Sequence, residues 1–385
     1  MGMNYLYWSK NLLIGLFISF VSGCSNRQVE GNPFSIAAEV NPSLSGKSIA
    51  SSYREGQAND YLLMSGSQLN QGLILGGFDR FMVHQRGSLL PEKLRDNFTA
   101  LGYFVQNTGA GVQSLCDRNR QFVALAAAPS RLGNQLKEKS KGDIICRDGH
   151  RIYAIPLGYD AKVFAVSPQN SFATSIDLEI LAKASQQANG NLLWSDIDSD
   201  WPSRPVRWVF AAQMPFVKHM EALGIQLPRN YLLASTYTQI FDAGASHPDA
   251  LIYTHYSPSL NARLQGNAFK ILPVATGKDQ IAIAPSPATI NSSYPAILKT
   301  DIVLYVNPTK SSSCIAIAFA GFLLEFNRSI LTENNMAPLE PSSRGVALKR
   351  VHRLLESSER HSTPYCQQTW RHKDGISQAL GGSPK

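Results

Sequence analysis

The chain has 385 residues, enough for two ordinary domains or for one two-lobed unit. Hydrophobic residues make up 44% and charged residues 17%, which permits a large packed core and argues against a chain that is disordered throughout. The net charge is +8, but the 36 lysines and arginines are scattered rather than gathered into runs. We therefore expect no nucleic-acid partner, whereas a moderately basic surface suits the capture of an anionic solute.

The N-terminus has the features of a signal peptide. Lys10 precedes an apolar stretch, Leu12 to Val21, that is too short to span a bilayer but fits the core of a signal sequence. The stretch ends in Val21-Ser22-Gly23-Cys24, which resembles the bacterial lipobox, where the cysteine is acylated and becomes the first residue. We expect lipidation of Cys24; an ordinary signal peptide with a chance cysteine is the alternative.

Export places the remaining cysteines in an oxidising compartment, where disulfides persist. These cysteines are Cys116, Cys146, Cys314 and Cys366, and four cysteines allow three pairings. Pairing between sequence neighbours is the simplest expectation. No pair has Cys-x-x-Cys spacing, which disfavours a zinc site, and we expect neither a metal nor a cofactor.

The sequence then alternates between strand and helix signals. Residues 24–58, rich in Ser, Asn, Gly and Pro, are expected to form a flexible tether. Apolar runs predict strands at 61–64, 104–105, 123–128, 152–155, 162–166, 206–210 and 301–306. Helical spacing predicts helices at 73–84, 91–101, 177–187 and 314–326, and a polar helix from Leu132. Such alternation predicts α/β organisation with mainly parallel sheets.

Several blocks resemble, in residue type and order, the phosphate-binding proteins of bacterial ABC importers. They lie at 107–111, 130–131, 155–170, 191–196, 201–206, 285–287, 294–295 and 304–307. The resemblance covers residues 60–330 and implies a periplasmic-binding-protein fold of the second type, a monomer with two α/β lobes and a ligand cleft between them. Cys116 and Cys146 also fall where some members carry a disulfide.

The resemblance also implies a division of the chain. The expected segments are 1–23, signal peptide; 24–58, tether; 59–158 with 291–350, first lobe; 159–290, second lobe; and 351–385, C-terminal helix and tail.

Three loops hold the anion in this family, with hydroxyls, backbone amides and one arginine. The resemblance implies a site made of Gly66, Ser67, Thr108, Gly109, Ser130 and Arg131. The third loop departs from the family, because Gln213-Met214-Pro215-Phe216 stands where Asp-Ser-Gly-Thr is expected. Met and Phe side chains donate no hydrogen bonds and proline lacks an N–H. We therefore expect weakened phosphate binding, or a ligand whose apolar part covers Met214 and Phe216.

The expected function is that of a lipid-anchored solute-binding protein on the periplasmic side of a bacterial membrane, inner or outer. It would bind phosphate or a related oxyanion and pass it to ABC permease subunits. A lipoprotein that keeps this fold but acts as a sensor or as a receptor for another ligand is the alternative.

We expect no enzyme, because the sequence contains neither Gly-x-Ser-x-Gly nor His-Glu-x-x-His. His247 and His255, near Asp242 and Asp249, are expected to be solvated loop histidines, with a metal site as the alternative.

Overall fold

The computed structural model describes residues 61–88, 100–105, 108–117, 122, 124–127, 137–139, 142–212, 214–258, 269–277, 279–310 and 313–361. All structural statements below concern these ranges. The expected signal peptide and tether, Cys24, Ser130, Arg131, Gln213 and Cys366 lie outside them.

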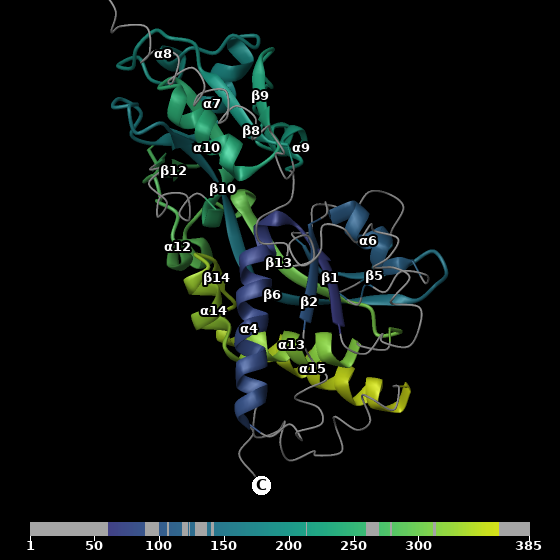
Figure 1. Cartoon of the computed structure of the whole chain (residues 1–385). Helices are drawn as coiled ribbons and strands as arrows, with labels where there is room; N and C mark the ends of the chain where they lie inside the picture. Colours follow the sequence, from purple (N-terminus) through teal and green to yellow (C-terminus); the bar gives the residue numbers. More distant parts are fainter. Residues whose placement is uncertain are drawn as a thin grey trace, which may run out of the picture. The chain divides into compact units, whose positions relative to one another are not determined.

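Eight strands follow one another through a mixed sheet, shown in Figure 1. In spatial order they are β2 (Ala100–Val105), β1 (Tyr61–Gly66), β3 (Ala124–Ala127), β13 (Lys299–Val306), β6 (Arg151–Val166), β10 (Ala250–His255), β8 (Arg207–Ala211) and β9 (Tyr231–Ala234). Short strands attach to β6 or to one another: β4 (Lys137–Lys139), β5 (Asp143–Ile145), β11 (Lys270–Ile271) and β14 (Ala337–Pro338). A separate pair is formed by β7 (Ile176–Asp177) and β12 (Val274–Ala275).

The helices fill the connections between these strands. They are α4 (Gln71–Ser88), α6 (Thr108–Cys116), α7 (Leu178–Gln187), α8 (Trp194–Ile197), α9 (Phe216–Ala222), α10 (Tyr237–Ser246), α12 (Pro287–Ser292), α13 (Ser313–Glu325), α14 (Asn327–Glu333) and α15 (Pro341–His361). Short 3-10 turns span η1 (Gln68–Asn70) and η2 (Ala296–Leu298). No single described helix is long and apolar enough to cross a membrane; α13 and α14 pass that test only together, across a bend of 85°.

The strand pairing is mixed rather than mainly parallel. β1 pairs in parallel with β2 and β3, and β8 does so with β9 and β10. β6 and β13 lie between these two parallel groups and run antiparallel to each other and to their outer neighbours, β10 and β3. The two strands predicted at 152–155 and 162–166 are one strand, β6. Its pairing with β13 shifts register between Pro156 and Gly158, as at a β-bulge.

Two of the predicted helices fail where the structure describes them. Residues 100–101 belong to β2, and Lys137–Lys139 form β4, which pairs with β5. In both places the backbone pairs with a neighbouring strand, so tertiary contacts override the local preference.

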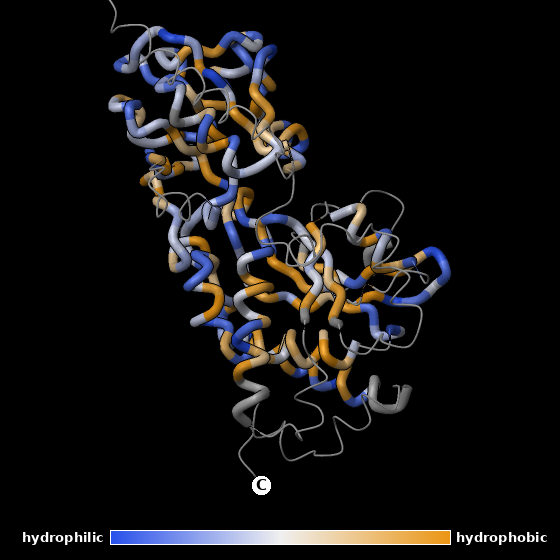
Figure 2. The backbone as a smooth tube through the Cα atoms, viewed as in Figure 1, coloured by the Kyte–Doolittle hydropathy of each residue, from blue (hydrophilic) through white to orange (hydrophobic). Residues whose placement is uncertain are grey.

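Hydrophobic residues gather on the strands and on α13, as the orange segments of Figure 2 show. A first core packs β1 and β2 against α4, α13 and α15. A second core surrounds β8, β10 and the C-terminal part of β6. Helix α15 continues through residue 351, the expected start of the C-terminal segment, and Val351, Leu354 and Leu355 pack in the first core.

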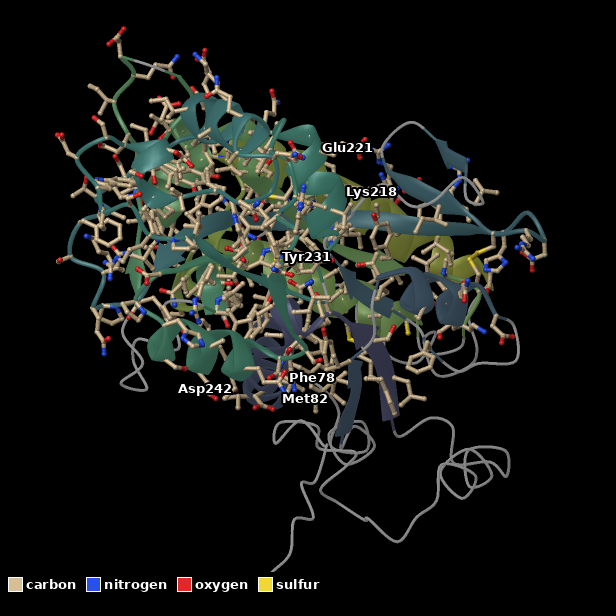
Figure 3. The ribbon with its side chains drawn as sticks, turned by 90° about the horizontal axis from the view of Figure 1, so that it is seen from above. Phe78, Met82, Lys218, Glu221, Tyr231 and Asp242 are labelled. Atoms are coloured by element: carbon tan, nitrogen blue, oxygen red, sulfur yellow. A yellow bond between two sulfur atoms is a disulfide. The ribbon has the colours of Figure 1, made fainter. Side chains whose placement is uncertain are left out.

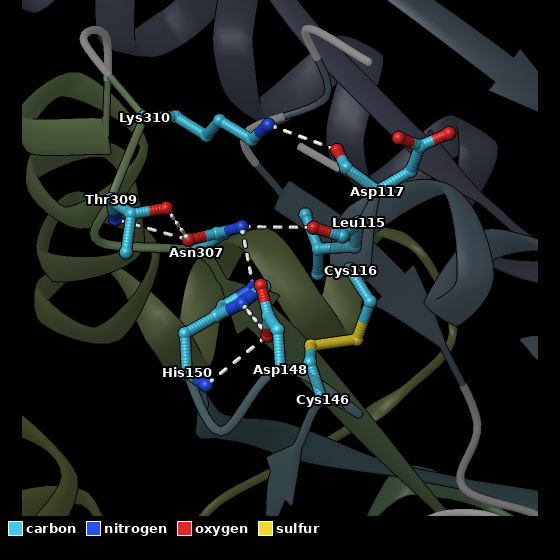
Figure 4. The surroundings of a disulfide bond; sticks show 9 residues. All are labelled: Leu115, Cys116, Asp117, Cys146, Asp148, His150, Asn307, Thr309 and Lys310. Atoms are coloured by element: carbon cyan, nitrogen blue, oxygen red, sulfur yellow. Dashed lines mark hydrogen bonds and ion pairs between the residues drawn. A yellow bond between two sulfur atoms is a disulfide. The ribbon is translucent and has the colours of Figure 1, made fainter. Parts of the chain in front are cut away.

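A third, small core contains the disulfide between Cys116 and Cys146, whose Cα atoms lie 5.6 Å apart (Figure 4). It joins the end of α6 to the residue after β5, and the predicted pairing is present. Beside it, the Asn307 amide donates a 2.8 Å hydrogen bond to the Leu115 carbonyl. Cys314 also belongs to a disulfide, whose partner lies outside the described residues, so its pairing with Cys366 stays a prediction.

Candidate functional site

The first group of predicted site residues lies where two neighbouring parallel strands end. Gly66 ends β1 and is in register with Val105, which ends β2. Ser67 follows β1 directly, while Thr108 and Gly109 open α6 shortly after β2. The structure thus brings Gly66, Ser67, Thr108 and Gly109 to the same edge of the sheet, which is where ligands bind in open α/β sheets.

Close packing requires a glycine at position 66. A Cβ atom there would lie 2.1 Å from the Tyr103 hydroxyl oxygen and 2.5 Å from the Ala126 carbonyl oxygen. The adjacent Ser67 amide already donates to that Ala126 carbonyl at 3.1 Å, and the Tyr103 hydroxyl donates to the Ser67 carbonyl at 2.9 Å. The backbone amide of Ser67, an expected anion donor, is therefore committed within the protein.

Several side chains at this strand end have unsatisfied polar atoms. The hydroxyls of Ser65 and Ser67 and both amide atoms of Asn70 are buried and lack a hydrogen-bond partner within the described ranges. Buried polar groups without partners are rare in folded proteins and disfavour the folded state by about 1–3 kcal/mol each. Burial also raises the pKa of Tyr103, so its hydroxyl stays protonated beside them.

The third loop does not face outward as an apolar ligand surface. Met214 and Phe216 are buried in the second core, and the Phe216 ring stacks on Phe210 with centroids 4.5 Å apart. Pro215 precedes α9 and provides no side-chain cap. The expectation that a ligand covers Met214 and Phe216 is therefore wrong: the second core covers them.

The side chain of α9 that is of interest here is His219. Lys218 and Glu221 are exposed on this helix, as labelled in Figure 3, while Phe216 and Met220 are buried. His219 lies between these two faces, with its ring 6.3 Å from the ring of Tyr253 in β10, and its Nδ1 atom is buried.

Sequence reasoning missed a polar cluster around β6 that includes His219. Asp160 and Lys162 are two residues apart on this strand, so their side chains share one face. Lys162 is the first residue of β6 in register with β10, where its partner is His255. The expectation of a solvated loop is wrong for His255, which ends β10 and is buried. The signal available in sequence was the Asp-x-Lys spacing within an apolar strand.

The Asp160 carboxylate holds this cluster together. One oxygen accepts hydrogen bonds from the Ala161 amide at 2.8 Å and the Ser257 amide at 3.2 Å. The other accepts from the Ser257 hydroxyl at 2.9 Å and lies 3.6 Å from Nδ1 of His255.

Burial dominates the protonation of the cluster. It raises the pKa of Asp160 to about 7, against the opposing effect of the hydrogen bonds from Ala161 and Ser257. Burial, helped by the charge of Lys162, lowers the pKa of His255 to about 3 and that of His219 to about 4. The pKa of Lys162 is itself lowered by burial, while Asp301 and Asp160 oppose that shift. Both imidazoles are therefore neutral at neutral pH.

Asp160, His255 and Ser257 are the residue types of a hydrolase triad, but they are not arranged as one. The Ser257 hydroxyl donates its hydrogen bond to Asp160. A serine nucleophile needs a general base on its hydroxyl, which in a triad is the histidine. Ser257 thus has a structural contact here rather than that of an activated nucleophile.

His247 and His255 form no metal-ligating group with other described residues. One group of three candidate ligands is present in the described part of the chain, namely Cys116, Cys146 and His150. Two of its members are already joined as a disulfide, and a thiolate is the form of cysteine that binds a metal.

Comparisons by sequence find no match, either among protein-family models or among curated proteins. Comparison with solved structures finds proteins of similar fold. A phosphate ABC transporter substrate-binding protein from Clostridium perfringens, solved with bound phosphate, is 13% identical, with a TM-score of 0.53 over 73% of this chain and 100% of that one. The chain has the fold of a type-2 periplasmic binding protein.

Two further solved structures share this fold. A human phosphate binding apolipoprotein is 12% identical, with a TM-score of 0.50 over 74% of this chain and 93% of that chain. An ancestral soluble variant of the human phosphate binding protein is 11% identical with the same TM-score, over 74% of this chain and 92% of that chain. These three structures with the same fold are all described as phosphate-binding proteins.

Proposed function

We propose that this chain is a solute-binding protein that takes phosphate or a related oxyanion at the carboxyl ends of β1 and β2. The observation that carries the proposal is the set of buried, unpartnered hydroxyl and amide groups of Ser65, Ser67 and Asn70 at that strand end. An oxyanion with several acceptor oxygens would satisfy such donors. The fold supports the proposal, because a protein with the same fold holds phosphate.

The proposed ligand set is the one expected from sequence: Gly66, Ser67, Thr108 and Gly109, together with Ser130 and Arg131, which lie outside the described residues. Of these, Ser67 provides a hydroxyl and α6 provides a helix N-terminus beside Thr108, while Gly66 allows the tight packing. Arg131 would add a bidentate, charge-assisted contact. The proposed lobes remain 59–158 with 291–350, and 159–290.

In its cellular setting, the protein would be anchored through a lipid on Cys24, on the periplasmic side of a bacterial membrane, and would deliver its solute to ABC permease subunits. The alternative, a sensor or receptor for another ligand, is favoured by the third loop, whose Met214 and Phe216 are used for packing.

Titration calorimetry of the purified full chain with phosphate tests the proposal. We expect a dissociation constant in the micromolar range or weaker, because donors from the third loop are missing. Ser67→Ala and Arg131→Ala should each weaken binding, by about tenfold or more for the arginine. Phosphate that fails to bind, while another solute in a thermal-shift screen raises the melting temperature, would favour the receptor alternative.

A further inference from the structure

Lys162 has an unusual environment for a lysine. It lies on β6 at the point where this strand stops pairing with β13, at Ala161, and begins pairing with β10. Lys162 as a whole is only 8% exposed. Within the described part of the chain its ammonium makes no hydrogen bond and no ion pair, although it interacts electrostatically with Asp301 and Asp160. Removing most of a lysine from water without such partners disfavours the folded state.

His219 lies near this ammonium and is also incompletely satisfied. Alternation along β6 places Lys162 on the same face as Phe164, whose ring lies 5.1 Å from that of Tyr253. α9 covers this face, because the His219 ring lies 6.3 Å from the same Tyr253 ring. Nδ1 of His219 is buried without a hydrogen-bond partner in the described ranges. Lys162 and His219, both without a hydrogen-bond partner in the described ranges, therefore lie on one face of the sheet and interact electrostatically.

We propose that Lys162 and His219 form a second half of the anion site, in place of the third loop. Lys162 supplies the charge and His219 a neutral imidazole N–H, and together they bind a tetrahedral oxyanion such as phosphate or sulfate. Asp160, which contacts His255 and Ser257, fixes the end of β10 beside them. This inference rests on the proposed function, and it assigns the second-lobe contacts to β6 and α9 rather than to Gln213–Phe216.

The chemistry favours an oxyanion over a cation or an apolar solute. Lys162 repels cations, and both His219 and Lys162 present N–H donors. The start of α9 is a poor anion site, because its N-cap residue, Pro215, has no N–H and its first side chain, Phe216, packs on Phe210. Charge-assisted hydrogen bonds from an ammonium are about twice as strong as neutral ones, so Lys162 should contribute much of the affinity.

The test compares Lys162→Met with Lys218→Met in the full chain. Both variants remove one positive charge, but Lys218 is an exposed neighbour of His219 on α9 and should not contact the ligand. Calorimetry with phosphate and with sulfate should show affinity weakened by about tenfold to a hundredfold in Lys162→Met. Lys218→Met should stay within about twofold of wild type, since screened surface charges contribute little.

The outcomes separate this inference from the proposed function. If wild type binds phosphate and Lys162→Met binds it with unchanged affinity, the inference is overturned and the proposed function stays intact. Wild type that binds neither probe overturns both. If Lys162→Met does not fold, the test passes to His219, which is only partly buried. His219→Gln should then fold and bind each probe more weakly. Unchanged affinity in a folded His219→Gln variant would then overturn the inference.

Discussion

The Ser257 hydroxyl donates a 2.9 Å hydrogen bond to the Asp160 carboxylate, connecting the segment after β10 to the middle of β6 across 97 residues of sequence. Asp160 is completely buried, so this contact and the two amide hydrogen bonds to the same carboxylate must replace its lost hydration. These hydrogen bonds offset the lost hydration only in part, because burial still raises the pKa of Asp160.

Asp160→Asn should change the pH dependence of stability. The folded-state pKa of Asp160 is raised from 3.8 to about 7, so its contribution is fully present below pH 3.8 and is lost as the pH rises toward 7. The pKa values of His219 and His255 are lowered, so their contributions are lost as the pH falls below 6.5. Asparagine does not titrate, so the variant should gain stability relative to wild type between pH 4 and about 7.

Urea unfolding of both proteins at several pH values measures this difference. The exposed Asp242→Asn variant provides the baseline for removing a carboxylate from the surface (Figure 3). A difference between Asp160→Asn and wild type that stays constant from pH 4 to 8 would contradict the assignment of a raised pKa to Asp160.

Phe216→Ala should destabilise the protein by about 3–5 kcal/mol, the usual effect of truncating a buried phenylalanine. Phe216 is 7% exposed, and it contacts the rings of Phe210 and Tyr231 at centroid distances of 4.5 and 5.4 Å. The neighbouring Val217→Ala, at a position that is 47% exposed, is the matched control and should have little effect. Chemical denaturation measures both, and equal effects would place Phe216 outside the core.

Removing the Cys116–Cys146 disulfide with a double serine variant should cost about 3.7 kcal/mol, because the cross-link closes a loop with a sequence separation of 30. Dithiothreitol should lower the stability of wild type by this amount. It should not do so in the double variant, which lacks the Cys116–Cys146 bond.

Peptide mapping without reductant should find Cys116 linked to Cys146 and Cys314 linked to Cys366. Free thiols at Cys116 and Cys146 in exported protein would contradict the first pairing.

Labelled fatty acid should enter the wild-type chain and not a Cys24→Ala variant, because the thiol of Cys24 is the proposed acceptor. Ser25→Ala changes the neighbouring residue and should still be labelled. The lipidated chain should also remain with membranes, since several acyl chains anchor a protein almost permanently whereas one holds weakly. Equal labelling of wild type and Cys24→Ala would exclude Cys24 as the attachment site.

Local sequence signals determined many elements of the fold. Leu178–Gln187 was predictable because Asp177 stands before an apolar helical pattern, and its carboxylate indeed caps the amides of Glu179 and Ile180. The strand at β1 and the helix at α13 were predictable because their hydrophobic residues are continuous in sequence. Ordered sequence blocks also predicted the type-2 binding-protein fold, although no block was diagnostic alone.

Only the tertiary structure decided what Asp160, Lys162, His219 and His255 do. They come from β6, α9 and β10, and sequence spacing does not reveal that α9 folds over the face that β6 and β10 share. Their protonation was equally hidden, because it follows from burial, which is a property of the packed chain. For the same reason, the sequence left open whether Met214 and Phe216 face a ligand or the core, and the packing of Phe216 on Phe210 decided it.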